Sequence, residues 1–346
     1  MRKKDLLLAL MCGSLCIEAA LSSAAETGRR PLKVLMIGNS FSESVMRETP
    51  KLAAASGFVL DIAQAGIGGC PLDKHWANVV KAEDPSFKPY SFHYSYGSLR
   101  DQSQASVAKL GAKTNIPQAL AAEKWDIVTI QQASGKSPFY KTYQPYADNL
   151  IAKIRELAPQ AEIVIQETWS YSPYDKRLEN WKMDPKGMHA ALKDAYSQLA
   201  KKRNLRVIPT GDAAQLFRER LPVVYGKLLT PEEISALEKP ATVDFHGDVA
   251  GRSVWEKGRK GQKTDANGFR LRMDRNHFNP RGHYLQACVW TAFLFKADPT
   301  AFTYRPEGLP ESDAKLMREC ARDAIAGWKT ACVLTEKKDN TKGTHE

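Results

Sequence analysis

The feature that most constrains the fold is an alternation of short apolar runs with helical patterns along most of the chain. Several runs are β-branched or apolar almost throughout, as is typical of strands in a parallel sheet that helices cover on both faces. The predicted strands are Lys33–Ile37, Phe58–Gln64, Ser91–Tyr96, Asp126–Gln131, Glu162–Gln166 and Arg206–Pro209. The predicted helices are Pro50–Ser56, Tyr146–Leu157, Gly187–Lys202 and one that opens at Asn279-Pro280. This order predicts an α/β fold, a three-layer α/β/α sandwich around a parallel sheet.

The N-terminus predicts export. A basic start at Met1–Lys4 precedes an apolar stretch from Leu6 to Leu21 and the small residues Ser22–Ala25. This pattern is typical of a secretory signal peptide at residues 1–25, and the alternative is an irregular N-terminus of a cytosolic protein. We therefore expect a periplasmic or secreted protein. No other stretch approaches the roughly 18–20 apolar residues that span a bilayer.

The rest of the chain predicts one large domain with additions. The main α/β domain is expected at 30–300, with an insertion at about 225–269 where the periodicity is lost. A helical extension is expected at 301–335, including an amphipathic helix at Ser312–Ala331. The polar residues 336–346 predict a disordered tail.

The cysteines that follow the predicted signal peptide are too few for a disulfide framework. No pair has the C-x-x-C spacing of zinc or redox sites. Cys320 and Cys332 are compatible either with a bridge or with two buried free thiols. The four are Cys70, Cys288, Cys320 and Cys332.

The charge balance predicts an affinity for anions. The formal net charge is +11, and eight Lys and Arg residues lie between Arg252 and Arg275 among only three acids, Glu256, Asp265 and Asp274. Such a segment attracts polyanions. We find neither a nucleic-acid-binding fold nor aromatic residues interleaved on a basic face, so no nucleic-acid partner is predicted. We expect a solvated loop that faces an anionic polysaccharide.

A serine follows the first predicted strand. Gly38-Asn39-Ser40-Phe41 comes directly after Lys33–Ile37, at the edge where open α/β sheets bind ligands. A serine in this position is either a turn or helix cap or a nucleophile. The chain has no G-x-S-x-G motif, which argues against the nucleophile elbow of the α/β-hydrolases.

A second polar cluster, Asp274-Arg275-Asn276-His277, lies far along the sequence. A serine hydroxyl needs a neighbouring imidazole to take its proton, and that imidazole needs a carboxylate to fix its tautomer. Alone, the Asp-x-x-His pair would be a solvated loop or a cap. With Ser40 it predicts a serine hydrolase whose catalytic residues are Ser40, Asp274 and His277.

These motifs resemble the blocks of the SGNH (GDSL-like) hydrolases, in particular a secreted bacterial branch with a Gly-Asn-Ser first block. Gly38-Asn39-Ser40 is similar to the first block, Asp274–His277 to the last, and Gly68–His75 to the second. The resemblance spans Leu32 to Lys296 and implies a flavodoxin-like three-layer fold. It also implies an oxyanion hole that includes the backbone amides of Ser40 and Gly69.

The third block departs from the family pattern. The family places an Asn after the next core strand, and this chain has Ile130-Gln131-Gln132-Ala133-Ser134 there instead. Because a Gln amide can donate as an Asn does, Gln131 is the predicted third oxyanion donor, with Gln132 as the alternative. The other possibility is that Gln131 only ties loops together.

Other polar residues predict no further chemistry. His75 and His283 are expected to pack or to contact substrate, and Asp244-x-His246-x-Asp248 is interpreted as a polar loop in preference to a metal site. No metal or cofactor is predicted. The whole pattern predicts an exported serine esterase acting on carboxylic esters, such as O-acetyl groups on carbohydrate. The alternative is a non-catalytic carbohydrate-binding protein with the same fold.

Overall fold

The computed structural model describes residues 30–173, 175–221, 241–244 and 248–340. The predicted signal peptide at 1–25 lies outside the described residues, as do much of the predicted insertion and the last six residues. Within the described ranges, no helix is both long and apolar enough to span a membrane.

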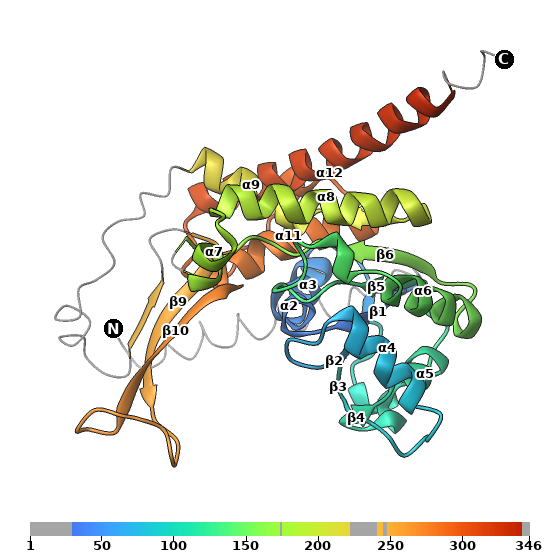
Figure 1. Cartoon of the computed structure of the whole chain (residues 1–346), viewed down its shortest axis with the longest axis horizontal. Helices are drawn as coiled ribbons and strands as arrows, with labels where there is room; N and C mark the ends of the chain where they lie inside the picture. Colours follow the sequence, from blue (N-terminus) through green and yellow to red (C-terminus); the bar gives the residue numbers. More distant parts are fainter. Residues whose placement is uncertain (1–29, 174, 222–240, 245–247, 341–346) are drawn as a thin grey trace, which may run out of the picture.

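A seven-stranded sheet with the order β4-β3-β2-β1-β5-β6-β7 forms the centre of the protein (Figure 1). The five neighbouring strands β2, β1, β5, β6 and β7 are parallel to one another. Helices lie on both faces, so the predicted three-layer α/β/α fold is confirmed. The strands are β1 (Leu32–Gly38), β2 (Leu60–Gly66), β3 (Tyr90–Tyr96), β4 (Lys113–Thr114), β5 (Ile127–Ile130), β6 (Glu162–Gln166) and β7 (Arg206–Ile208).

The sheet differs from the prediction at one edge, where β3 and β4 run antiparallel to their neighbours. The burial pattern explains the difference. All residues of β2 are buried, whereas in β3 buried Tyr90, Phe92 and Tyr96 are interspersed with more exposed residues such as His93. A strand with one covered face and one partly solvated face is typical of antiparallel pairing.

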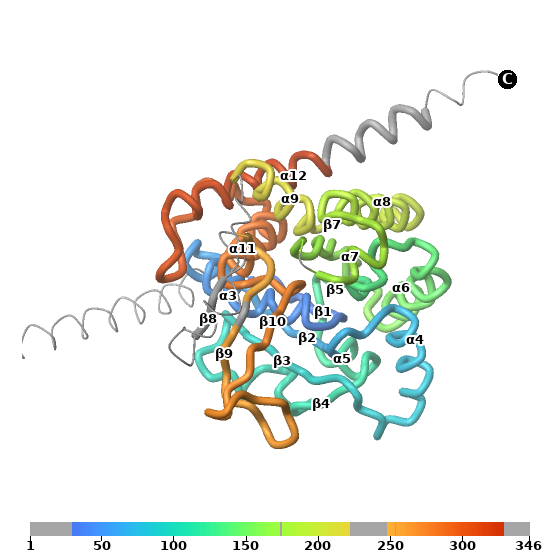
Figure 2. Tube along the Cα trace, turned by 60° about the vertical axis from the view of Figure 1, so that its left-hand side comes forward, coloured from blue at the N-terminus to red at the C-terminus, as the bar shows by residue number. Residues whose placement is uncertain are grey.

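Two groups of helices cover the sheet (Figures 1 and 2). On one face α4, α5 and α6 pack against one another. On the other face α11 packs against α3 and α9, and α12 lies outside α11 and α9. The helices are α2 (Ser40–Glu43), α3 (Val45–Ala55), α4 (Leu72–Lys81), α5 (Ile116–Ala121), α6 (Tyr146–Leu157), α7 (Lys176–Trp181), α8 (Pro185–Arg203), α9 (Thr210–Arg220), α11 (Pro280–Phe295) and α12 (Glu311–Asn340).

A second, three-stranded antiparallel sheet projects from the body (Figure 1). It consists of β8 (Ala241–Asp244), β9 (Ala250–Lys257) and β10 (Phe269–Phe278). The basic run from Arg252 to Arg275 therefore lies largely on paired strands, and the expectation of a solvated loop was wrong for this part. The two strands pair from Phe269 with Lys257 to Asp274 with Arg252, so backbone pairing shapes a segment whose side chains show no clear period.

Helix α12 settles one of the alternatives left open by the cysteines. Cys320 is a buried free thiol, and both it and Cys332 lie on this one continuous helix. Twelve residues of α-helix separate them by about 18 Å along the axis, which is too far for a disulfide. The helix also continues to Asn340, beyond the start of the predicted tail, and 341–346 are outside the described residues.

The sheet order defines where a site can form. From β1 the chain passes to β2 on one side, and β5 pairs with β1 on the other side. The carboxyl end of β1 is therefore a topological switch point, and open α/β sheets bind ligands in the crevice at such a point. Ser40 follows β1 directly.

Buried His75 predicts a pH-dependent stability. It lies on α4 with Nδ1 2.9 Å from the Tyr90 hydroxyl, and burial lowers its pKa from about 6.5 to about 4. Because the unfolded chain takes up the proton first, stability is lost as the pH falls from 6.5 towards 4. His75→Phe should remove about 3 kcal/mol of this loss. Urea unfolding of the wild-type protein and of His75→Phe at pH 7 and pH 4 measures this effect. If the difference in unfolding free energy between the two proteins were the same at both pH values, the prediction would be contradicted.

Candidate active site

Ser40 lies on a tight turn between β1 and α2. Asn39 caps α2 with its side-chain oxygen, which accepts a hydrogen bond from the Phe41 N–H at 3.0 Å. A Cβ atom at Gly38 would lie 2.4 Å from the Ser42 hydroxyl, so only glycine permits this close turn. The turn therefore explains why the sequence reads Gly-Asn-Ser after a buried strand.

His277 and Asp274 lie at the end of β10, beside Ser40. His277 Nε2 is 2.8 Å from Ser40 Oγ, and its Nδ1 is 2.8 Å from Asp274 Oδ2. The pairing of β10 with β9 is irregular between Asp274 and Phe278, and such an irregularity re-aims side chains. Asp274 and His277 thus lie on a distorted strand end.

The Asp274 carboxylate accepts several hydrogen bonds from neighbouring residues. Its Oδ1 accepts hydrogen bonds from the backbone N–H groups of Asn276 and His277. Burial raises the pKa of Asp274, but these bonds and the one from the His277 ring outweigh burial and hold the pKa well below its usual range. Asp274 is therefore ionised at neutral pH and can orient the imidazole.

A stack of three aromatic rings joins the serine and histidine segments. The Trp169 ring lies parallel to Phe41, with centroids 4.0 Å apart, and to Phe278, with centroids 3.5 Å apart. Its indole N–H donates to the Asn276 carbonyl at 2.9 Å. Trp169 thus holds the residues next to Ser40 and His277 together. Sequence reasoning missed it, and its only signal was a Trp shortly after a core strand.

The other expected oxyanion donors are the backbone N–H groups of Ser40 and Gly69. Ser40 and Gly69 line one cavity with His277, of about 360 Å³. Gly69 has a positive φ of 62°, which glycine adopts without strain. Within the described part of the chain, neither the Ser40 N–H nor the Gly69 N–H donates a hydrogen bond. Both amides are therefore available to an oxyanion.

The expected third donor is not in this cavity. Gln131 is buried, and its amide Nε2 donates to Asn39 Oδ1 at 2.7 Å. The alternative residue, Gln132, accepts from the Leu72 N–H and donates to Thr142. Neither side chain lines the cavity beside Ser40, so the expectation of a Gln donor was wrong. Gln131 orients Asn39, and Asn39 Nδ2 in turn donates to the Cys70 carbonyl next to Gly69.

Of the two histidines expected to pack or to contact substrate, His75 is buried and His283 is partly buried. His75 ends the second block, and its Nδ1 lies 2.9 Å from the Tyr90 hydroxyl. His283 lines a cavity of about 650 Å³ that also reaches Ser40 and His277. Burial lowers its pKa to about 4, and Arg47 and Arg252 add to the effect.

The Asp-x-His-x-Asp segment does not form a described metal site. His246 lies outside the described residues. Asp248 is fully buried and pairs with Arg218, Oδ1 to Nε 2.9 Å. The Asp248 carboxylate is therefore occupied by a structural ion pair.

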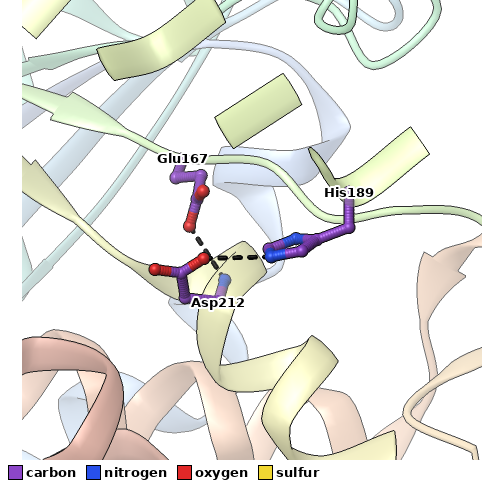
Figure 3. Close-up of side chains that lie close together, drawn as sticks. All are labelled: Glu167, His189 and Asp212. Atoms are coloured by element: carbon purple, nitrogen blue, oxygen red, sulfur yellow. Dashed lines mark hydrogen bonds and ion pairs between the residues drawn. The ribbon is translucent and has the colours of Figure 1, made fainter. Parts of the chain in front are cut away.

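A different cluster has the composition of a metal site. Among the described residues, one ligand atom each of Glu167, His189 and Asp212 lies within 4.8 Å of the others. Figure 3 shows the side chains of Glu167 and His189 directed at Asp212. His189 Nε2 is 3.1 Å from Asp212 Oδ1, and Glu167 Oε2 accepts from the Asp212 N–H at 2.9 Å.

The charges in this cluster are balanced from within the chain. The Lys193 ammonium lies 2.8 Å from Asp212 Oδ2. Burial raises the pKa of Glu167 well above its usual value, and the Asp212 carboxylate raises it further. These three residues could hold a cation, but their hydrogen bonds and ion pairs already explain them as an anchor for the N-terminus of α9.

The fold and the site together define a class of protein. A mostly parallel α/β/α sandwich carries Ser40, His277 and Asp274 in hydrogen-bonded order at the switch point, with free amides at Ser40 and Gly69. This is the architecture of the SGNH hydrolases, so the predicted resemblance is confirmed at the level of the fold.

Comparison with known proteins gives the family. Residues 33–220 match the model of a domain of unknown function, DUF4886, so the chain belongs to the DUF4886 family. A crystal structure of a DUF4886 protein from Bacteroides uniformis is 25% identical, with a TM-score of 0.62, and the match covers 86% of this chain and 95% of that chain. No curated protein matches the sequence.

Two more distant structures are similar in part. One is a proposed SGNH hydrolase from Slackia heliotrinireducens, with 18% identity, a TM-score of 0.39 and coverage of 76% of this chain and 98% of that chain. The other is a GDSL-like lipase from Bacteroides thetaiotaomicron, with 16% identity, a TM-score of 0.28 and coverage of 61% and 80%. Because both TM-scores are low, the assignment of the site rests on its own geometry.

The ring stack gives a prediction about stability. Trp169→Ala should cost about 3–5 kcal/mol of unfolding free energy, as large-to-small core substitutions at Trp do. Trp169→Phe keeps an aromatic ring and loses the hydrogen bond to Asn276, so it should cost less. Urea unfolding measures both. If the two variants were equally unstable, the hydrogen bond and not the stack would hold these segments together.

Proposed function

We propose that this protein is a serine esterase that hydrolyses carboxylic esters, with Ser40 as nucleophile, His277 as base and Asp274 as the residue that orients it. The observation that carries the proposal is the hydrogen-bonded series from Ser40 Oγ through His277 to Asp274, with 2.8 Å at each step. An imidazole at this distance can take the hydroxyl proton as the oxygen attacks.

The reaction then follows from the positions of the atoms. Ser40 Oγ attacks the ester carbonyl while its proton passes to His277 Nε2, and the imidazolium is stabilised by ionised Asp274. The tetrahedral oxyanion accepts hydrogen bonds from the N–H groups of Ser40 and Gly69. When the intermediate collapses, His277 returns the proton to the leaving alcohol, and water later releases the acyl group by the same steps.

The cellular setting and the substrate are part of the proposal. The basic, apolar and small residues of the first 25 positions support export. We infer O-acyl groups on carbohydrate as the target, such as O-acetyl groups, because a sugar polymer offers many ester-bearing hydroxyls and the cavity beside Ser40 is lined by small and polar residues.

A fluorophosphonate probe tests the nucleophile. An activated serine displaces fluoride from such a probe and forms a stable bond to phosphorus. The wild-type protein should be labelled on Ser40, and Ser40→Ala should lose both the label and hydrolysis of 4-nitrophenyl acetate, a loss on the order of 10⁶ in turnover for triad knockouts. Ser44→Ala is a matched control beside the site. Labelling of Ser40→Ala at the wild-type rate would exclude Ser40 as the nucleophile. Absence of labelling of the wild-type protein would favour a non-catalytic carbohydrate-binding protein.

The role of Gln131 gives a second kinetic prediction. Loss of a direct oxyanion donor costs about 10²–10³ in kcat, but Gln131 acts through Asn39. Gln131→Ala should therefore lower kcat by less than tenfold, and should lower the unfolding free energy by about 1–3 kcal/mol because a buried Asn39 oxygen loses a donor. Kinetics with 4-nitrophenyl acetate and urea unfolding measure the two effects. A 10³-fold loss of kcat at unchanged stability would restore Gln131 as a donor.

A further inference from the structure

Three cavities adjoin one another across the catalytic residues. The central cavity beside Ser40 shares Ser40 and His277 with the cavity of about 650 Å³ on its α3 side. It shares Arg177 and Asn276 with a third cavity, of about 460 Å³, on its α7 side. The α3-side and α7-side cavities share no residue, so the three form a row with the catalytic serine near its middle. We call this row the groove.

The α3 end of the groove carries both cations and acids. Arg47, Lys51 and Arg252 line it together with Glu43, Glu48 and Asp274. Burial lowers the pKa of the neighbouring His283, and all three cations add to this effect. Arg47 forms an ion pair with Glu43, at 3.5 Å between the charged atoms, and Lys51 forms one with Glu48, at 3.0 Å. Among the side chains that the structure describes, Arg252 has no ion-pair partner, and its cross-strand neighbour Asp274 is hydrogen-bonded to His277.

The α7 end is also cationic. Lys176, Arg177 and Arg275 line it together with a single acid, Asp175. Asp175 is committed to Arg177, with 2.6 Å between the charged atoms. Lys176 is exposed, and the described part of the chain provides no ion pair for it. Positive charge therefore lies on both sides of the reacting serine.

The groove is poorly suited to a lipid. The only large apolar side chains exposed among the described residues are Val80 and Met273, and only Met273 borders the groove. An extended acyl chain or a membrane surface would need a wider apolar patch. A row of cavities, each within the range of roughly 300–1,000 Å³ typical of small-ligand sites, instead matches successive units of a polymer.

We propose that the groove binds an anionic polysaccharide, with sugar carboxylates at its α3 and α7 ends and an O-acyl unit at Ser40. Arg252 and Lys176 select the polymer by its charge on either side of the reacting ester. This inference rests on the proposed esterase function and extends it to the class of substrate. The basic β9–β10 hairpin, which carries both Arg252 and Arg275, contributes the surrounding positive field.

A binding experiment tests the groove independently of turnover. Ser40→Ala protein is titrated calorimetrically with oligogalacturonate and with the same oligomer after its carboxylates are converted to amides. We expect the anionic oligomer to bind roughly tenfold more tightly at low salt, with the difference shrinking as salt screens the charges. Equal affinities for the two oligomers would overturn the proposal.

Charge-removal variants identify the residues. Adding R252Q and K176Q to the Ser40→Ala protein should abolish the preference for the anionic oligomer. K109Q removes one exposed charge on the β3–β4 connection, away from the groove, and should retain the preference. If the double substitution retained it, or if K109Q lost it, the polymer would bind elsewhere and the proposal would fail.

An activity measurement separates this proposal from the esterase function. With Ser40 intact, kcat/KM is compared for the O-acetylated forms of the two oligomers and for 4-nitrophenyl acetate. Hydrolysis of the small ester with no preference between the oligomers would support the esterase and reject the anionic substrate. Preferential binding of the anionic oligomer without hydrolysis of any ester would support the groove and reject the esterase.

Discussion

The geometry of the proposed catalytic site depends on the stacking of Trp169 between Phe41 and Phe278. These rings belong to segments that are far apart in the chain, and Ser40 and His277 are 237 residues apart. Phe41 follows Ser40 and Phe278 follows His277 in the chain, so the stack holds the Ser40 hydroxyl near the His277 imidazole. Since Trp169 follows the core strand β6, the sheet itself sets the position of the stack.

A buried ion pair fixes the base of the projecting hairpin. Arg218 on α9 pairs with fully buried Asp248 and donates to Ser170, and the Asp248 carbonyl accepts a hydrogen bond from the Asn279 side chain at 2.7 Å. Asn279 also caps α11. The strand that carries His277 is thus held at its end although its hairpin projects from the body. Removing one partner of such a buried pair leaves an uncompensated charge, which makes this contact a structural requirement.

The site combines a rigid centre with charged surroundings. The amides of the proposed oxyanion hole lie beside the hydrogen bonds that run from Gln131 through Asn39 to the Cys70 carbonyl. Around this centre, cations on α7, α3 and the hairpin lie in or beside the groove. In the proposed function, the chemistry then lies at the edge of the sheet and the selection of substrate at its periphery, as is common where loops vary around a rigid scaffold.

The sequence by itself determined the layered α/β fold, the serine at the end of β1 and the helix that Asn279 caps, because each depends on local periodicity, turn chemistry or capping. It also indicated Asp274 and His277, since the chemistry of a serine nucleophile requires that pair. Only the tertiary structure decided that β3 is antiparallel, that Gln131 binds Asn39, and that Trp169 joins the two halves of the site. Those outcomes depend on contacts between segments distant in the chain, and a single sequence records the residues of such contacts but not their partners.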